Sequence, residues 1–206
     1  MFSLFIIAFL GAASADLLYE GQCPDVAPVE NFNMQAYEGT WYEVAMLPLY
    51  NQMNGKCSTS VYTLEGDGLS VRNSHIVNGV KQYLDGNVKH ADQSKSGKLI
   101  QSFKIAHRVK VVEPYILAID YQNYAIAYSC RYDESKKSHY TFAWVLSRSK
   151  TLEGDAKTAV ENFLQNHSSI IESSKLIPTD FSEEACSFSS SFSLSNPKMF
   201  NAAARH

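Results

Sequence analysis

The chain has 206 residues, with 18 basic and 21 acidic side chains, so its formal net charge is −3. This length fits one domain or two small ones, and the near-neutral charge excludes the basic surface typical of nucleic-acid-binding proteins or of polybasic membrane-surface proteins. The 25 aromatic residues (12 Tyr, 11 Phe and 2 Trp) are numerous, while charged residues make up only 19% of the chain. Abundant aromatic side chains exclude a disordered or fibrous protein. The composition therefore predicts a compact globular protein whose aromatic excess needs an explanation.

The N-terminal residues 1–15 carry no charged side chain, and residues 2–10 form an apolar run. Small residues, Ala13-Ser14-Ala15, precede Asp16 in the pattern of a cleavage site. A transmembrane anchor needs about 20 apolar residues, and this run is shorter. We therefore expect residues 1–15 to be a signal peptide and the mature protein to be secreted and extracellular, with no membrane span.

Four cysteines, Cys23, Cys57, Cys130 and Cys186, fit an oxidising compartment. They are too widely spaced for a zinc site of the C-x-x-C type, and we expect no metal site. Spacing alone leaves all three possible disulfide pairings open. The tripeptide Asn166-His167-Ser168 makes Asn166 a candidate for N-glycosylation.

The middle of the chain contains eight short β-rich runs separated by polar turns. The runs cover residues 41–47, 58–64, 69–77, 80–88, 98–105, 110–120, 124–132 and 139–147. Asn78-Gly79 between two of them is a strong hairpin signal. Sequential runs with tight turns predict an antiparallel meander, either a sandwich or a closed barrel.

The hydrophobic period then changes to that of a helix. Between residues 153 and 167 the apolar residues are spaced by 3, 1, 3 and 1, namely Ala156, Ala159, Val160, Phe163 and Leu164. This spacing predicts one amphipathic helix. Residues 175–181 suggest one more short strand. The Ser-rich residues 187–206 are expected to form a flexible tail without a role in the core.

Three motifs mark the ends of these runs. Gly39-Thr40-Trp41 opens the first run, Asp120 precedes the seventh, and Arg148 ends the eighth. A guanidinium in this place is expected to stack on the Trp41 ring and to bond backbone carbonyls.

With these motifs in this order, the sequence resembles the lipocalin family, and within it most closely the insect bilin-binding and insecticyanin group. The resemblance covers residues 21–186 and is strongest over residues 128–134, 144–150, 154–162 and 180–186. It implies an all-β fold, an eight-stranded antiparallel up-and-down barrel with one C-terminal α-helix packed outside, built from residues 16–186. The sequence departs from the family at Ile119, because the family usually has a Thr before the Asp that corresponds to Asp120. It also departs in the tail beyond residue 186, which has no counterpart in the family. The resemblance also implies the disulfides Cys23–Cys130 and Cys57–Cys186.

Alternation along the last run places Tyr140, Phe142 and Trp144 on one face. By itself this pattern also fits a solid aromatic core, but the resemblance favours a pocket for a flat, conjugated ligand. On the third run Asn73 and His75 share a face with apolar neighbours. Polar groups in such a setting are typical of residues that orient a ligand.

Matching to the family implies further site residues. Those expected to face inward are Leu84, Phe103, Ile105, Val112 and Ser129, and those expected near the open end are Tyr50, Asn51, Arg108, Lys110 and Arg131. Basic groups at the rim would meet the two propionates of biliverdin, although single rim charges are more often simply solvated.

The resemblance thus implies a secreted pigment carrier that binds biliverdin, non-covalently if all four thiols are paired. The alternative is a carrier of another small hydrophobic ligand, such as a fatty acid, retinoid, pheromone, carotenoid or haem. An enzyme is not expected, because G-x-S-x-G, H-E-x-x-H and phosphate-loop motifs are absent from the sequence. Whether the chain forms a homo-oligomer stays open.

Overall fold

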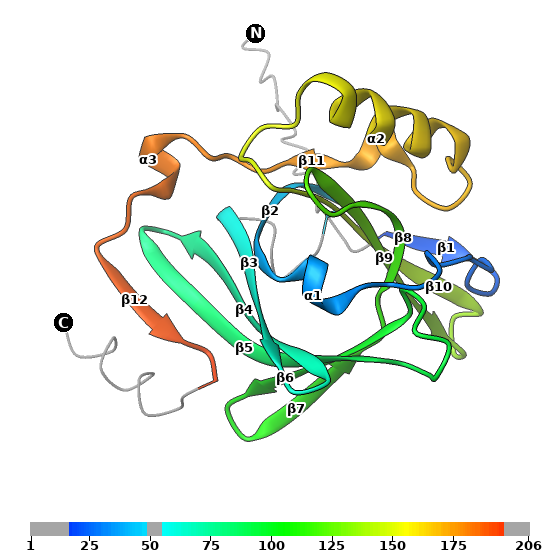
Figure 1. Cartoon of the computed structure of the whole chain (residues 1–206), viewed down its shortest axis with the longest axis horizontal. Coiled ribbons are helices and arrows are strands. Elements are labelled where there is room, and N and C mark those ends of the chain that lie inside the picture. The colour runs from blue at the N-terminus through cyan, green and yellow to red at the C-terminus, as the bar shows by residue number, and fades with distance from the viewer. Residues whose placement is uncertain (1–16, 49–54, 196–206) are drawn as a thin grey trace, which may run out of the picture.

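One antiparallel sheet curls around a central axis in the computed structural model, which describes residues 17–48 and 55–195 (Figure 1). Its main strands are β2 (Gly39–Met46), β3 (Lys56–Glu65), β4 (Gly68–Val77), β5 (Val80–His90), β6 (Leu99–Ile105), β7 (Arg108–Val112), β8 (Tyr115–Asp120), β9 (Tyr124–Asp133) and β10 (Ser138–Ser147). Their order in the sheet is β7-β6-β5-β4-β3-β2-β10-β9-β8. Pairing of β2 with β10 joins the beginning of the meander to its end. The expected antiparallel barrel is confirmed.

The strand count differs from the expected eight because the run 110–120 is two strands, β7 and β8. Glu113-Pro114 separates them. Proline lacks the N–H that a strand ladder requires, so it interrupts pairing. As a result β7 pairs with β6, whereas β8 pairs with β9. Lys98, just before β6, bridges to Tyr115 at the start of β8, so the two ends of the sheet meet there.

Helix α2 (Gly154–Asn166) is the predicted amphipathic helix, and it packs outside the barrel (Figure 1). Its buried residues Val160 and Leu164 lie in a cluster with Ile126 and Val145 on the outer side of β9 and β10. No helix in the described part of the chain is long and apolar enough to cross a membrane.

The remaining elements are short and lie around the barrel. They are β1 (Leu18–Glu20), α1 (Met34–Tyr37), a 3₁₀ turn (Ser173–Lys175), β11 (Ile177–Pro178), α3 (Glu183–Cys186) and β12 (Ser190–Ser193). The strand expected over 175–181 is thus reduced to the two residues of β11. Helix α1 was not predicted; Asn33 caps it by accepting the Ala36 N–H at 3.0 Å.

Part of the segment expected to be a flexible tail is a strand. Residues Ser190–Ser193 form β12, which pairs in parallel with the start of β5. Serine carries little strand signal, so the alternating Ser-Phe-Ser pattern gave no prediction here. Residues 196–206 lie outside the described part of the chain.

Both disulfides have the pairing that the resemblance implies. Cys23 is bonded to Cys130, which ties the N-terminal segment to β9. Cys57 is bonded to Cys186, which ties the C-terminal segment to β3. They join residues 107 and 129 positions apart in the sequence. Closing such long loops restricts the unfolded chain and stabilises the fold by about 4–5 kcal/mol each in the chain-entropy model.

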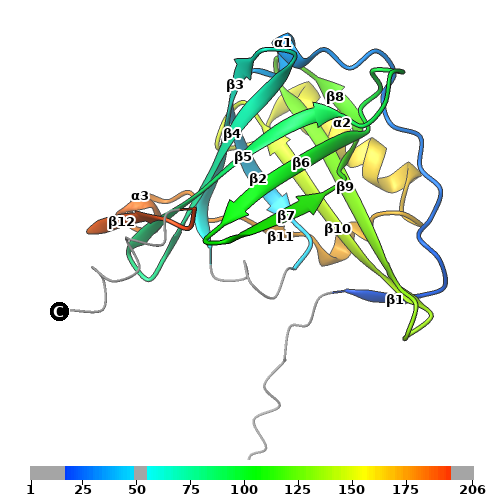
Figure 2. The same cartoon turned by 90° about the horizontal axis from the view of Figure 1, so that it is seen from below.

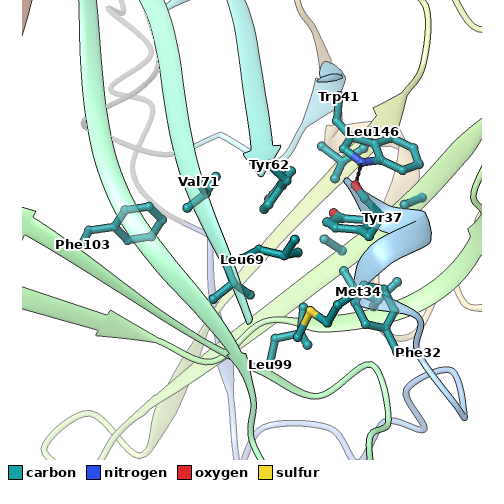
Figure 3. Close-up of a cluster of buried hydrophobic side chains, with 14 residues drawn as sticks. Phe32, Met34, Tyr37, Trp41, Tyr62, Leu69, Val71, Leu99, Phe103 and Leu146 are labelled. Carbon is teal, nitrogen blue, oxygen red and sulfur yellow. Dashed lines mark hydrogen bonds between the residues drawn. The ribbon is translucent and has the colours of Figure 1, made fainter. Parts of the chain in front are cut away.

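One end of the barrel is filled by a tightly packed hydrophobic cluster, and α1 lies across this end (Figures 2 and 3). The cluster residues are Phe32, Met34, Tyr37, Trp41, Tyr62, Leu69, Val71, Val88, Leu99, Phe103, Ile116, Ala125, Ala127 and Leu146. Trp41 has no exposed surface, and its indole N–H donates to the Tyr37 carbonyl at 2.8 Å. The side chains of α1 therefore close this end as part of the core.

Arg148 seals the same end from outside. Its guanidinium carbon lies 3.7 Å from the centroid of the Trp41 ring. It donates to the backbone oxygens of Ala36 (3.1 Å), Thr40 (3.0 Å) and Tyr121 (3.0 Å). The expected stacking and carbonyl bonding of Arg148 are both confirmed.

Gly39 and Asp120 shape the backbone around the Arg148 clamp, the name used here for the contacts of Arg148 with the Trp41 ring and three backbone carbonyls. Gly39 has φ of +99°, and a Cβ there would lie 3.2 Å from Nη1 of Arg148, so both conformation and space favour glycine. Asp120 accepts from the side-chain amide of Asn123 (2.8 Å) and the backbone N–H of Gln122 (2.9 Å). These bonds lower the pKa of Asp120 and hold the β8–β9 turn.

The clamp predicts that Arg148→Ala destabilises the protein by about 3 kcal/mol, because it leaves three carbonyls unpaired and removes the cation–π contact. Arg148→Lys should restore less than half of this loss, since an ammonium lacks the planar fork. Urea unfolding followed by intrinsic fluorescence measures both.

The matched control is Arg72→Ala. Arg72 is paired with Asp85 at 2.6 Å on the surface, and its side chain is 61% exposed. Its loss should cost less than about 1 kcal/mol. Equal costs at the two arginines would contradict the clamp.

Candidate ligand-binding site

Inward-facing side chains become more exposed along the barrel away from α1. On β4, Leu69 and Val71 are buried, whereas Asn73 and His75 are half-buried. On β10, Leu146 is buried, whereas the inward-facing aromatic residues are half-buried. These side chains point into the ring and are only half-buried, so this half of the interior is less completely packed than the half beneath α1. We refer to the end opposite α1 as the open end.

The three aromatic residues predicted to share a face do so. In the register with β9, Tyr140 faces Arg131, Phe142 faces Ser129 and Trp144 faces Ala127. Ala127 belongs to the interior cluster, and Trp144 packs against that cluster. The aromatic face of β10 therefore points into the barrel.

Asn73 lies on the inner face of β4. Its register partners are Ser60 on β3 and Leu84 on β5. Its Oδ1 atom is buried and accepts no hydrogen bond from the described residues. Leaving such an acceptor unpaired costs about 1–3 kcal/mol. An N–H donor from a molecule inside the barrel would remove that cost.

His75 lies on the same face of β4, two residues closer to the open end. Partial burial lowers the pKa of His75, and a hydrogen bond with Gln82 opposes this only in part. The imidazole is therefore neutral at neutral pH and presents one donor and one acceptor.

Glu43 is an interior group that the sequence analysis did not assign to the site. It is the register partner of the inward-facing Leu146. Its side chain keeps some exposure, yet desolvation raises the pKa of its carboxyl to about 7. Desolvation is the main cause that raises the pKa of Tyr37 and Tyr62, and the charge of Glu43 raises both further. Alternation from Trp41 would have indicated that Glu43 faces inward.

Basic side chains surround the open end. The Arg131 guanidinium carbon and the Lys136 nitrogen lie 4.8 Å and 5.2 Å from the centroid of the Tyr140 ring, and Lys136 also donates to the Tyr140 hydroxyl. Arg108 and Lys110 on β7 are exposed and share the inner face of the sheet through their register with β6. Lys136 was missed because it lies in the β9–β10 turn, where alternation gives no direction.

The other predicted inward residues follow the same register. Leu84, Phe103, Ile105, Val112 and Ser129 all lie on the inner face. Ser129 is buried and its hydroxyl donates to the Glu113 carbonyl at 3.3 Å, so it is already partnered. Tyr50 and Asn51, predicted at the rim, lie outside the described residues.

The model of the lipocalin / cytosolic fatty-acid binding protein family matches residues 38–183. The chain belongs to the lipocalin family. Insecticyanin-B of Manduca sexta is 46% identical over 195 residues, which cover 93% of this chain and 95% of the relative. The bilin-binding protein of Pieris brassicae is 43% identical over 183 residues, which cover 89% of this chain and 96% of the relative. The resemblance seen in the sequence is confirmed.

Solved structures agree with this assignment. The structure of insecticyanin from the tobacco hornworm matches this lipocalin with a TM-score of 0.85 and 46% identity, covering 89% of this chain and 98% of that one. Lobster apocrustacyanin A1 matches with a TM-score of 0.68 at 21% identity, covering 82% of this chain and 93% of that one. At this lower identity the likeness extends to the fold alone.

The chemistry available in this lipocalin is that of a binding site. All four cysteines are in disulfides. Among residues 17–48 and 55–195, no three or more His, Cys, Asp or Glu side chains gather as metal ligands. The interior offers flat aromatic surface, an unpaired amide oxygen, a neutral imidazole and a carboxyl with raised pKa.

The raised pKa of Glu43 predicts a pH dependence of stability. The folded protein holds this proton more tightly than the unfolded chain, so its contribution is complete below the ordinary pKa of 4.5 and is lost as pH rises through about 7. Relative to Glu43→Gln, the wild type should lose up to about 3 kcal/mol between pH 4.5 and pH 8.5, at about 1.4 kcal/mol per pKa unit. Urea unfolding of both proteins at the two pH values measures the difference.

Glu161 provides the control because it is exposed on α2. Glu161→Gln should track the wild type within about 0.5 kcal/mol at both pH values. A Glu43→Gln protein that keeps a constant difference from the wild type would show that this carboxyl is ionised normally.

Proposed function

We propose that this lipocalin is a secreted carrier that binds biliverdin non-covalently inside its barrel. The observation that carries the proposal is the buried, unpaired Oδ1 of Asn73, which faces the same interior as the aromatic side chains of β10. A bilin is a flat, conjugated chain of four rings that carries N–H groups along its length. It would supply both the donor that Asn73 lacks and a surface for the aromatic rings.

The names of the relatives support the same ligand class. One is a bilin-binding protein, and 43% identity to it extends over nearly the whole of both chains. This lipocalin has no free cysteine, so a thioether to the chromophore is not available. The bilin would therefore be held by contacts alone.

The rim fits the acidic end of such a ligand. Biliverdin carries two propionates, and Arg131 and Lys136 present two cations beside Tyr140. Arg108 and Lys110 lie on β7, at another part of the open end. Propionates at the rim would pair with these side chains while the rings remain in the interior.

A fatty acid, the simplest alternative ligand, fits less well. Its only polar group is the carboxylate, which accepts hydrogen bonds at neutral pH. It would leave the Asn73 oxygen unpaired and would place an apolar chain beside Glu43. We therefore place biliverdin ahead of fatty acids and other simple hydrophobic ligands.

Secretion is part of the proposal. Residues 1–15 have the pattern of a signal peptide, and both disulfides fit an oxidising compartment. Asn166, in the glycosylation tripeptide, is exposed at the last residue of α2. N-terminal sequencing and glycosidase treatment of the protein secreted by cultured insect cells test both points.

The ligand proposal is tested by titrating the apoprotein with biliverdin. We expect a red-absorbing complex with an induced circular dichroism band and quenched tryptophan fluorescence. Asn73→Leu should weaken binding about tenfold because one hydrogen bond to the ligand is lost. The same change should stabilise the apoprotein by about 1 kcal/mol, because it removes a buried unpaired acceptor.

These opposite effects separate a ligand-binding asparagine from a structural one. The matched control is Asn87→Leu on β5, where the side chain is exposed. It should leave binding unchanged. A wild type without an induced dichroism band would refute the bilin proposal, and unchanged binding by Asn73→Leu would remove Asn73 from the site.

A further inference from the structure

Strand β5 has two different neighbours along one edge. Its second half, from Gly86 to His90, pairs with β6. Its first four residues, starting at Val80, pair instead with β12. Strand β12 therefore occupies the edge that β6 leaves free near the open end of the barrel, on the side away from α1 (Figure 2).

Hydrogen bonds at the end of β12 bridge β5 to the β6–β7 turn. The Leu194 N–H donates to the Tyr83 carbonyl at 2.7 Å, and the Leu194 carbonyl accepts from the Ala106 N–H at 3.1 Å. Between the two pairings, the Asp85 N–H donates to the Ser195 hydroxyl oxygen at 3.1 Å. The segment thus fills the gap between β5 and β6 and continues the wall.

The beginning of the segment lies against the outer side of β5. The Ser189 N–H donates to the Gly79 carbonyl at 2.9 Å. The Lys81 nitrogen lies 5.3 Å from the centroid of the Phe188 ring. Phe188 remains 48% exposed.

Phe192, in the middle of β12, lies on the inner face of the sheet, opposite to the side on which Phe188 lies. Phe192 is the register partner of Gln82, which is in turn the register partner of His75. Paired residues on neighbouring strands place their side chains on the same face of a sheet. Phe192 is half-buried, and it shares the inner face with His75 and Asn73.

We propose that residues 187–195 form an additional wall strand of the ligand site and that Phe192 contacts the bound ligand near the open end. This inference rests on the proposed carrier function. The match to the family model ends at residue 183, so the strand lies beyond the region that defines the family. An aromatic ring next to Gln82, on the same inner face as His75 but two strands away from it, adds flat contact area near the open end, where the ligand must pass on leaving. Its main effect is therefore on the dissociation rate.

The test is the dissociation of biliverdin from the full mature chain, measured by stopped-flow transfer to excess serum albumin. Phe192→Ala should increase the dissociation rate about tenfold, as expected for losing part of one buried aromatic contact. The matched control is Phe188→Ala, which changes the same residue type in the same segment but on the outer side. It should leave the rate within about twofold of the wild type.

Two truncations separate the strand from the residues that follow it. A chain ending at Ser195 keeps β12 and should behave as the wild type. A chain ending at Ser187 keeps the Cys57–Cys186 disulfide but lacks β12, and it should release biliverdin at least as fast as Phe192→Ala. Thermal unfolding of each apoprotein confirms that the barrel is folded.

The outcomes distinguish the two proposals. If the wild type binds biliverdin and neither Phe192→Ala nor the shorter truncation changes its release, the wall-strand proposal is wrong and the carrier proposal stands. Equal acceleration by Phe188→Ala and Phe192→Ala would also overturn the role given to Phe192. If the wild type does not bind biliverdin, the carrier proposal fails and the role of Phe192 in bilin binding fails with it.

Discussion

The contact between Arg148 and Trp41 is the constraint on which the rest of the barrel depends. The guanidinium follows β10, stacks on a ring from β2, and bonds carbonyls from α1, from β2 and from the β8–β9 turn. Burial lowers the pKa of Arg148, and the three carbonyl dipoles and the π face of Trp41 offset part of this cost of burying the charge. Strands β2 and β10 also pair with each other to close the ring. The side chain of Arg148 therefore holds together both this strand pair and helix α1, which covers the end of the barrel. The closed end is therefore filled by buried side chains.

A barrel stabilised at one end tolerates polar groups elsewhere in its interior. Asn73 keeps an unpaired oxygen, and desolvation holds the pKa of Glu43 near neutrality. Each arrangement costs stability that an apolar residue of similar size would not cost. Such costs concentrate at sites where a protein binds or acts, because selection for function opposes selection for stability there. The polar interior groups therefore support the proposed ligand site.

Much of this arrangement could be predicted from local pattern, and the exceptions have definite physical causes. Period-two alternation placed Tyr140, Phe142 and Trp144 correctly, because β10 is regular along that stretch. The break at Pro114 had a visible signal, since proline cannot join a ladder, but an apolar run on either side concealed it. Lys136 contacts Tyr140 only through the geometry of a turn, which alternation does not describe. Alternation on β4 predicted that Asn73 and His75 share a face, whereas the missing hydrogen bond of Asn73 depends on the whole interior.

The C-terminal strand shows why a weak sequence signal still produces structure. Three of the four residues of β12 are serine, so its intrinsic strand preference is low. The disulfide to Cys57 on β3 fixes Cys186, the last residue of α3, only a few residues before β12 begins. Pairing then closes a short loop instead of recruiting a free chain end, and the entropy lost on pairing is correspondingly small.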